Sequence, residues 1–541
     1  MLNYTNLRMP LLFLCAAGTA VADYDGGRIA NYDGTYEGVI KVTADPLSGG
    51  AVDATIANIH TVLEGDITVK TDESKATSSS LTYGHAIRTA NAASSITLNT
   101  NAPADMLNVT VSGLGGSAVR ADAGYVYIDA SAYTGEGAGI RFLLNNPNIA
   151  SEDKKVWETA GFQVYGGHVS VKGETYVETL TERGYGYFIS TGSITVNGDT
   201  EFLTRGSGSY GIRAMGGTIT HNGNLTIKTT ATAASGYLYH SYGIHANGGA
   251  AITLDGALDI STAGSGAHGV YAASGGSNLV FKQAAKIHTA GSSAYAIYAT
   301  GAGSSIAFES GDLDLKSSAN YAIYAGTGGK ITLNGIKLLV PKSTTTADAM
   351  RTQGGTIEGV GRYTFEGRMT SAGTNGKIDL KMQNGSIYKG QTVISGTTAK
   401  INLSLEDASE WTLVGSSSLS TLDADAGSSL IFTISGAADF TRISKSESFS
   451  LDDGAIMKIV LGDYNPVDGD TFNLVSSDLY DISKNIVFDF SEAELADGLF
   501  WDIDDFFENG TISVTSIPEP AAIAAAIGLA AATLTWHRRK R

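Results

Sequence analysis

Cysteine, proline and basic residues are scarce in this chain of 541 residues, which has one cysteine and 8 prolines. Because the single cysteine is Cys15, a disulfide-stapled fold is excluded. Lys and Arg total 36 against 54 acidic residues, and the formal net charge of −18 disfavours nucleic-acid binding. Charged residues make up 17% of the chain and hydrophobic residues 43%, which excludes a highly charged disordered protein.

Glycine is abundant instead, at 67 residues, and part of it belongs to a short phrase that recurs along the chain. The phrase has five places: an aromatic residue or histidine, a small residue, an aliphatic residue, a polar or aromatic residue, and alanine. It opens at Tyr210, Tyr242, His268, Tyr295 and Tyr321, and the last four openings are 26, 27 and 26 residues apart. Such a fixed period indicates a solenoid, in which each unit buries its apolar edge only by stacking on its neighbours.

One unit, starting at Tyr321, holds three short runs of alternating residues, at 321–325, 330–333 and 336–338, with Gly and Asn turns between them. Period-two runs joined by such turns predict short strands, three to a coil. Helices are disfavoured because the runs are short and rich in Gly, Ser and Thr. We therefore expect an all-β fold, a right-handed parallel β-helix, with a short signal helix at the N-terminus and a transmembrane helix at the C-terminus.

The first 22 residues have the features of a secretory signal peptide. Arg8 precedes an apolar segment from Leu11 to Ala17, and Ala20-Val21-Ala22 places small residues at the −3 and −1 positions of a cleavage site. The alternative for this segment is a buried N-terminal strand. Removal of the signal would also remove Cys15, and the exported protein would then have no thiol.

The repeat weakens after residue 365. Trp411 and several serines lie between residues 410 and 422, and a Ser-Ser-Leu segment follows at 428–430. This part resembles the closing coils of autotransporter-type passenger β-helices, and the segments that follow at 456–461, 469–474, 501–502 and 510–514 resemble the cap that ends related surface β-helices. We expect four regions along the chain: a signal peptide (1–22), a repetitive parallel β-helix (23–365), terminal coils with a cap (366–516), and a sorting signal with a transmembrane segment and a basic tail (517–541).

The tail carries the most specific motif of the sequence. A Pro-Glu-Pro tripeptide precedes the apolar or small residues 521–536, and a basic cluster ends the chain. The residues of the tripeptide and of the cluster are Pro518, Glu519, Pro520, Arg538, Arg539, Lys540 and Arg541. Together these three parts resemble the PEP-CTERM sorting signal.

This resemblance implies an exosortase-type sorting enzyme as a partner and cleavage near the tripeptide. The protein would be anchored in the inner membrane through its C-terminus before processing, and would then reach the cell surface or the extracellular matrix. A helix of about 16 residues spans ~24 Å, less than the ~30 Å of a bilayer core, which suits a transient anchor. The alternative is an ordinary C-terminal anchor.

Motifs for nucleotide binding, serine hydrolysis or zinc hydrolysis are absent from the sequence, which contains no GxxxxGK[ST], GxSxG or HExxH. His85, His245 and His268 fall within the repeated phrase, and stacked coils could bring two of them together as a metal pair, but a third ligand is not evident. The acidic turns at 463–470 and 502–508 offer oxygens for calcium without matching an EF-hand loop, and solvated turns are the alternative. We expect no catalytic residue, no cofactor and no metal.

Four carboxylates near turns leave an enzymatic alternative open. A β-helix polysaccharide lyase or glycosidase would need convergent carboxylates on one face. The side chains that could supply them are Asp255, Asp259, Asp312 and Asp314. A secreted enzyme of this kind is the alternative to a non-enzymatic surface protein.

The phrase also predicts an aromatic face. Strict alternation places its first, third and fifth residues on the core side and its second and fourth residues outside. Stacked coils then align the fourth-place residues Tyr271, Tyr298 and Tyr324 beside a shallow strip of small second-place residues. Two interpretations stay open: an aromatic ladder that stabilises the sheet, or a face on which rings of a surface or matrix polysaccharide stack. We expect an adhesin or a structural component of the envelope or matrix.

Overall fold

The structure is a computed structural model, which describes residues 21–44, 50–71, 85–112, 116–145, 159–232, 240–317, 321–340 and 348–516. It falls into two units, residues 1–336 and 337–541. Both are built almost entirely of strands; the one helix in the described ranges is α1 (Phe506–Asn509). No helix of the described residues combines the length and apolarity needed to span a bilayer. The predicted sorting signal lies outside these ranges, as does the predicted signal peptide apart from Val21 and Ala22, which begin β1 (Val21–Gly26).

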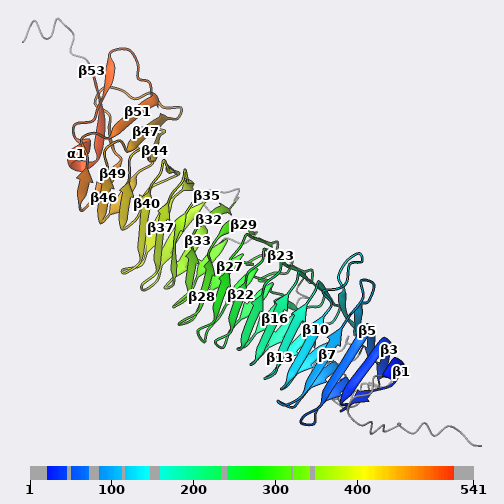
Figure 1. The fold of residues 1–541 in the computed structure, drawn as a ribbon. Helices are drawn as coiled ribbons and strands as arrows, with labels where there is room; N and C mark the ends of the chain where they lie inside the picture. Colours follow the sequence, from blue (N-terminus) through cyan, green and yellow to red (C-terminus); the bar gives the residue numbers. More distant parts are fainter. Residues whose placement is uncertain are drawn as a thin grey trace, which may run out of the picture. The chain divides into compact units, whose positions relative to one another are not determined.

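In the first unit, parallel strands form three ladders, as expected for a parallel β-helix (Figure 1). Ladder one contains β2 (Ile29–Ala30), β4 (Gly50–Ala54), β6 (His85–Thr89), β9 (Val119–Ala121), β12 (Thr159–Val164), β15 (Gly184–Ile189), β18 (Tyr210–Ala214), β21 (Ile244–Ala246), β24 (Val270–Ala272), β27 (Ile297–Ala299) and β30 (Ile323–Ala325). Ladder two contains β7 (Ser95–Asn99), β10 (Tyr125–Asp129), β13 (His168–Lys172), β16 (Ser193–Asn197), β19 (Thr218–His221), β22 (Ala251–Leu254), β25 (Asn278–Phe281), β28 (Ser305–Phe308) and β31 (Lys330–Leu333). Ladder three contains β8 (Leu107–Ser112), β11 (Ile140–Asn145), β14 (Thr175–Thr179), β17 (Thr200–Thr204), β20 (Leu225–Thr229), β23 (Leu258–Thr262), β26 (Ala285–Thr289) and β29 (Gly311–Ser317).

The first coils are simpler. Their long strands β3 (Gly34–Ala44) and β5 (His60–Thr71) pair in parallel over their length, and β5 pairs with β7 along one half and with β8 along the other. Ladders two and three therefore start as one continuous strand and separate where a turn divides each later coil.

The core of the first unit lies between the three ladders. In the coil that begins with β27, its members are Ile297, Ala299, Ile306, Phe308, Leu313 and Leu315, all buried. Each of these residues alternates with an outward-facing neighbour, because successive side chains of a strand point to opposite faces. Equivalent residues of successive coils are in register, for example Ile297 with Ile323, so that like side chains stack along the core.

The second unit repeats this architecture and ends in a cap. Its parallel ladders include β33 (Asp348–Gln353), β36 (Arg368–Ala372) and β39 (Thr392–Ser395); β34 (Thr356–Gly361), β37 (Lys377–Met382) and β40 (Lys400–Leu405); and β35 (Tyr363–Glu366), β38 (Ile387–Gly390) and β41 (Glu410–Leu413). The cap contains β48 (Thr471–Asn473), β52 (Leu499–Asp502) and β53 (Thr511–Ser516), which are antiparallel. Trp411 is fully buried and stacks on Tyr388, with ring centroids 5.6 Å apart.

Candidate functional site

The candidate site is the outer face of ladder one in the first unit. Two columns of side chains run along it, formed by the first and fourth places of the repeated phrase. The first-place column contains Gly50, His85, Ser117, Ala160, Tyr185, Tyr210, Tyr242, His268, Tyr295 and Tyr321. The fourth-place column contains Asp53, Arg88, Arg120, Gln163, Phe188, Arg213, His245, Tyr271, Tyr298 and Tyr324, each in register with the next.

The predicted position of the first-place residues is wrong in the direction of the side chain, although Tyr210 is buried as expected, at 5% exposure, in a cluster with Ala160, Tyr185 and Phe188. They were expected in the core with the third and fifth places, but their rings contact the fourth-place rings on the outside. Within one phrase the two ring centroids are 5.4 Å apart for His268 and Tyr271 and 5.5 Å apart for Tyr295 and Tyr298. At Gly269 and Ala296 the chain bends at the second place, before the strand begins, and this bend breaks the alternation; at Tyr210 the first place already lies within β18.

The predicted strip of small residues is wrong for the same reason. The second-place residues face the core and not the surface. A Cβ atom added to Gly243 would collide with Ile260, and one added to Gly269 would collide with Ile287. Small residues are required at this place because a core side chain from ladder three already fills the space.

The C-terminal half of the face is a double row of stacked rings. In the first-place column, the Tyr185 and Tyr210 centroids are 5.3 Å apart at 6°, and the Tyr210 and Tyr242 centroids 5.2 Å apart at 7°. In the fourth-place column, Tyr271 stacks on Tyr298 at 4.6 Å and 11°. The predicted alignment of Tyr271, Tyr298 and Tyr324 is confirmed by their register. Pairs of this geometry contribute about 0.5–1.5 kcal/mol beyond the area they bury.

The faces of the Tyr271 ring are both covered. His245 stacks on one face, with ring centroids 4.9 Å apart at 7°, and Tyr298 covers the other. Tyr324 meets Tyr298 edge-on, with ring centroids 5.0 Å apart at 66°. Burial, together with the negative charge that Tyr298 would carry on ionising, raises the pKa of Tyr271 to about 12. These contacts are those of a stabilising ladder, and polysaccharide stacking on this row stays a prediction.

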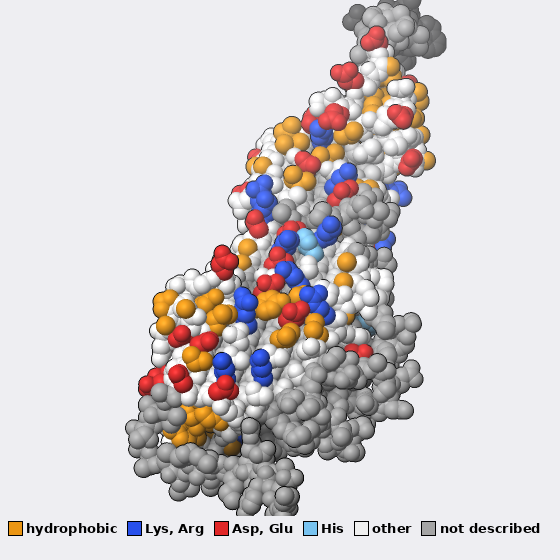
Figure 2. All heavy atoms as spheres, turned by 90° about the vertical axis from the view of Figure 1, so that its right-hand side faces the viewer, with side chains coloured by type: hydrophobic (Ala, Val, Ile, Leu, Met, Phe, Trp, Pro, Cys, Tyr) orange, Lys and Arg blue, Asp and Glu red, His pale blue; other side chains and the backbone are white. Residues whose placement is uncertain are grey.

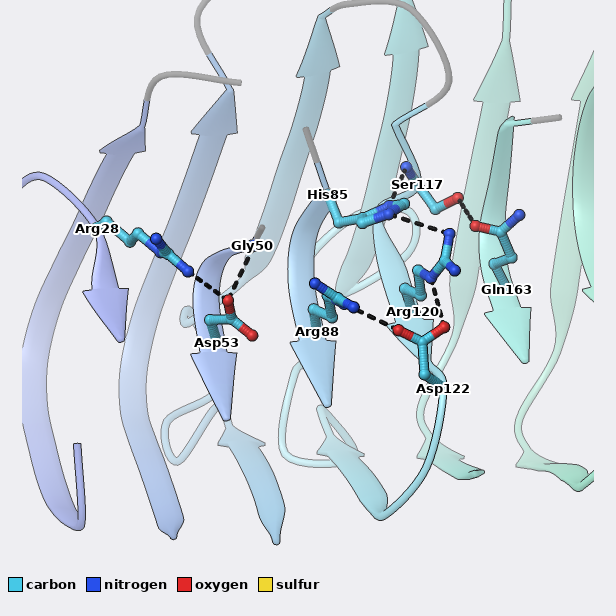
Figure 3. A network of polar contacts seen from close by, with 9 residues as sticks. All are labelled: Arg28, Gly50, Asp53, His85, Arg88, Ser117, Arg120, Asp122 and Gln163. Carbon is cyan, nitrogen blue, oxygen red and sulfur yellow. Dashed lines mark hydrogen bonds and ion pairs between the residues drawn. The ribbon is translucent and has the colours of Figure 1, made fainter. Parts of the chain in front are cut away.

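The N-terminal half of the same face is charged, and Figure 3 shows its contacts. Asp53 is 1% exposed and pairs with Arg28 at 2.5 Å. Asp122 accepts hydrogen bonds from Arg88 Nε at 2.9 Å and from Arg120 Nε at 2.6 Å. Along the face, partly buried ion pairs therefore give way to stacked rings without a change in backbone register.

His85 lies among these arginines. Its ring nitrogens face two donors, the Ser117 backbone N–H at 3.2 Å and Arg120 Nη1 at 3.2 Å. A neutral imidazole has one bare nitrogen, so only one of these bonds forms at a time. Burial and then the charges of Arg120 and Arg88 lower the pKa of His85 well below its ordinary value. The ring therefore stays neutral and acts as an acceptor.

Two further histidines lie in the aromatic half. Burial and then the charge of Arg213 lower the pKa of His245 to about 4. Burial, followed by the charges of His240 and His245, lowers the pKa of His268 to about 3, and His268 Nδ1 accepts the Tyr295 backbone N–H at 3.0 Å. The described residues include no group of three or more His, Cys, Asp or Glu side chains placed to hold a metal ion.

The carboxylates named as candidate catalytic groups are placed along the coils and not in one cluster. Asp255 pairs with Lys282 at 2.8 Å and Asp259 with Lys286 at 3.7 Å. In ladder three, Lys286 lies between Asp259 and Asp314, which separates these two carboxylates by one coil. Figure 2 shows basic and acidic side chains next to one another over the face turned to the viewer.

A cavity of about 610 Å³ lies elsewhere on the first unit, against ladder three, and sequence reasoning did not find it. Its lining includes Arg141, Glu174, Tyr176, Asp199 and Glu201. Asp199 accepts two hydrogen bonds from Asn224, at 2.8 and 3.1 Å, while Glu201 pairs with Lys228 at 2.9 Å. Burial and then the charge of Glu178 raise the pKa of Tyr176.

Comparison with known proteins adds no family to this picture: no protein-family model matches the chain, and none of the curated proteins matches it significantly.

Proposed function

We propose that this chain is an exported cell-surface β-helix, wound in the right-handed sense, which acts without catalysis as an adhesin or as a structural component of the envelope or extracellular matrix. The observation that carries the proposal is the tail, Pro518-Glu519-Pro520 followed by an apolar segment and a basic cluster. An exosortase-type enzyme would recognise this signal while the helix anchors the protein in the inner membrane. Right-handed winding is the sense that crossovers between parallel strands adopt.

The organisation of the coils supports a structural role. Outward-facing charges pair with opposite charges of the next coil, as Lys228 does with Glu201 and Arg205 with Glu178. The outer face of ladder one uses large aromatic side chains to join successive coils. A long array of such units suits a spacer or a display surface, because each unit is stabilised by its neighbours.

The sorting step is tested by replacing Pro518, Glu519 and Pro520 with alanine in the full chain. In a host that carries the sorting enzyme, we expect unprocessed protein to accumulate in the inner membrane, measured by fractionation and immunoblotting. Glu494→Ala, a change at an exposed glutamate outside the tail, is the control and should be processed normally. Unchanged surface delivery of the triple variant would reduce the tail to a simple anchor.

The second candidate is a secreted polysaccharide lyase or glycosidase, and the cavity against ladder three favours it. Glu174, Asp199 and Glu201 provide carboxylates there, beside the cation of Arg141. The test is the release of oligosaccharides from bacterial and plant polysaccharides by the purified chain. Activity that Glu201→Gln and Asp199→Asn abolish would replace the non-enzymatic proposal.

A further inference from the structure

Two tyrosines are exposed on the outer side of ladder two, away from the columns of ladder one. Tyr125 is 41% exposed and Tyr127 44% exposed, while Val126 and Ile128 of the same strand β10 are buried. Single apolar side chains are often exposed on protein surfaces, but neighbouring ones are exposed together less often. A pair of exposed tyrosine rings is therefore a candidate binding surface. Their ring centroids are 5.9 Å apart and their planes differ by 3°.

The contacts of Tyr125 fix how both rings are turned. Tyr125 stacks on His168 of the next coil, with ring centroids 4.9 Å apart at 20°. Strands of neighbouring coils are about 4.8 Å apart, so a stack at this spacing directs the ring faces along the solenoid axis. Tyr127 is parallel to Tyr125 and displaced along the strand. The two rings therefore stand side by side and present their faces in the same direction.

The preceding coil presents short side chains to those faces. Tyr125 is in register with Ser95 and Tyr127 with Thr97, and both partners are short hydroxyl side chains. On its other side, Tyr127 is in register with Ser170, again a short side chain. Tyr125 is the one ring that Tyr127 contacts within the described residues. We call the surface made by the two phenol rings and the hydroxyl groups of Ser95 and Thr97 the slot; Ser95 Oγ also lies 2.9 Å from His60 Nδ1.

We propose that this slot binds a neutral polysaccharide, with two consecutive sugar rings stacked on Tyr125 and Tyr127. The apolar C–H faces of a sugar pack on aromatic faces, and its hydroxyls find partners in serine and threonine side chains. Two carboxylates lie beside the slot: Asp129 pairs with Lys172 at 3.2 Å, whereas Glu64 accepts a hydrogen bond from the neutral amide of Asn99 at 3.3 Å and keeps its negative charge. The uncompensated carboxylate of Glu64 would repel an anionic sugar, and the lysine beside it in the described part of the chain is already paired with Asp129, so a neutral chain is the ligand that the slot fits.

This inference rests on the proposed function in one respect: a protein that is exported to the cell surface encounters such polysaccharides. Binding is measured on the purified chain without any sorting step. A failure to bind sugars would therefore contradict only the slot, and a failure of surface delivery would contradict only the proposed sorting.

The experiment compares three variants with the wild type by calorimetric titration. The probes are neutral hexasaccharides (cellohexaose, laminarihexaose, maltohexaose and a mannohexaose) and hexagalacturonate as the anionic counterpart. Tyr125→Ser with Tyr127→Ser removes both rings, and Thr97→Tyr fills the slot with a third ring while keeping both tyrosines. Thr195→Tyr is the matched control, because Thr195 lies in the same column two coils beyond Tyr127.

We expect at least one neutral hexasaccharide to bind the wild type, with affinity at least tenfold weaker in the double variant and in Thr97→Tyr, and unchanged in Thr195→Tyr. Circular dichroism melts should show that Thr97→Tyr stays folded, so its loss of binding reports on the slot. Absence of binding to every neutral probe would overturn the inference, as would binding that survives Thr97→Tyr or a preference for hexagalacturonate. Self-association of the wild type that the double variant abolishes, without sugar binding, would assign the pair to a contact between copies and also overturn it.

Discussion

The histidine in the middle of the fourth-place column should make this part of the solenoid sensitive to acid. Burial and Arg213 hold the pKa of His245 at about 4 in the folded protein, against an ordinary value of 6.5. The unfolded chain therefore takes up a proton below pH 6.5 that the folded chain refuses until about pH 4. Above pH 6.5 the imidazole is neutral in both states and the folded state keeps its full stability. As the pH falls from 6.5 towards 4, protonation of the unfolded chain progressively destabilises the folded state.

The magnitude follows from the two pKa values. Between pH 7 and pH 5, the free energy of opening around His245 should fall by about 2 kcal/mol, since each pKa unit is worth about 1.4 kcal/mol. His245→Tyr should remove the part of this loss that His245 causes, while His268, whose pKa burial lowers to about 3, keeps its own pH dependence. The next three coils carry tyrosine at the same place, and His245 stacks on the first of them, Tyr271. The substitution also breaks no hydrogen bond of the ring, because His245 Nδ1 is buried without a partner.

Hydrogen exchange of the amides of β21 measures this opening, because stacked coils open locally. We expect the wild type to lose protection at pH 5 after correction for the intrinsic exchange rate, and His245→Tyr to lose clearly less. His60→Gln, at an exposed histidine in the first coils, is the matched loss of a histidine and should behave as the wild type. An equal loss of protection in the wild type and in His245→Tyr would refute the reasoning.

Two further predictions concern the same face. Replacing Tyr271, Tyr298 and Tyr324 together with serine should lower the thermal midpoint strongly, since each stacked pair is worth about 0.5–1.5 kcal/mol beyond its buried area; a loss of polysaccharide binding with the midpoint nearly unchanged would instead favour the stacking-face interpretation. Gly269→Ala should cost about 1–3 kcal/mol in urea unfolding, because its Cβ would collide with Ile287. Adding Ile287→Leu should recover part of that loss, because the next coil combines Ala296 with Leu315 at the equivalent places, and a double variant no more stable than Gly269→Ala would contradict this account.

The repeat in the sequence was enough to predict the type of fold. A period of 26 or 27 residues with three alternating runs gave three short strands per coil, and the structure confirms the parallel ladders. The identity of most core residues also followed, for example Ile323 and Ala325 in the strand β30. These features are local, because the alternation within a run already decides which side chains of a strand point inward.

The surface features depended on contacts that no local pattern contains. Strict alternation failed at the second place of the phrase. The second-place residue faces inward and must be small, because a Cβ atom there would collide with Ile260 or Ile287. The ring at the first place therefore faces outward. Whether a tyrosine is covered or open depended on the residue in register one coil away: His245 and Tyr298 cover Tyr271, whereas Thr97 and Ser170 leave Tyr127 open. The sequence by itself determined that coils stack, and the tertiary structure decided which side chains of each coil are covered and which are exposed. The physical reason is that the neighbour which sets exposure, stacking and pKa is distant along the chain and adjacent only after folding.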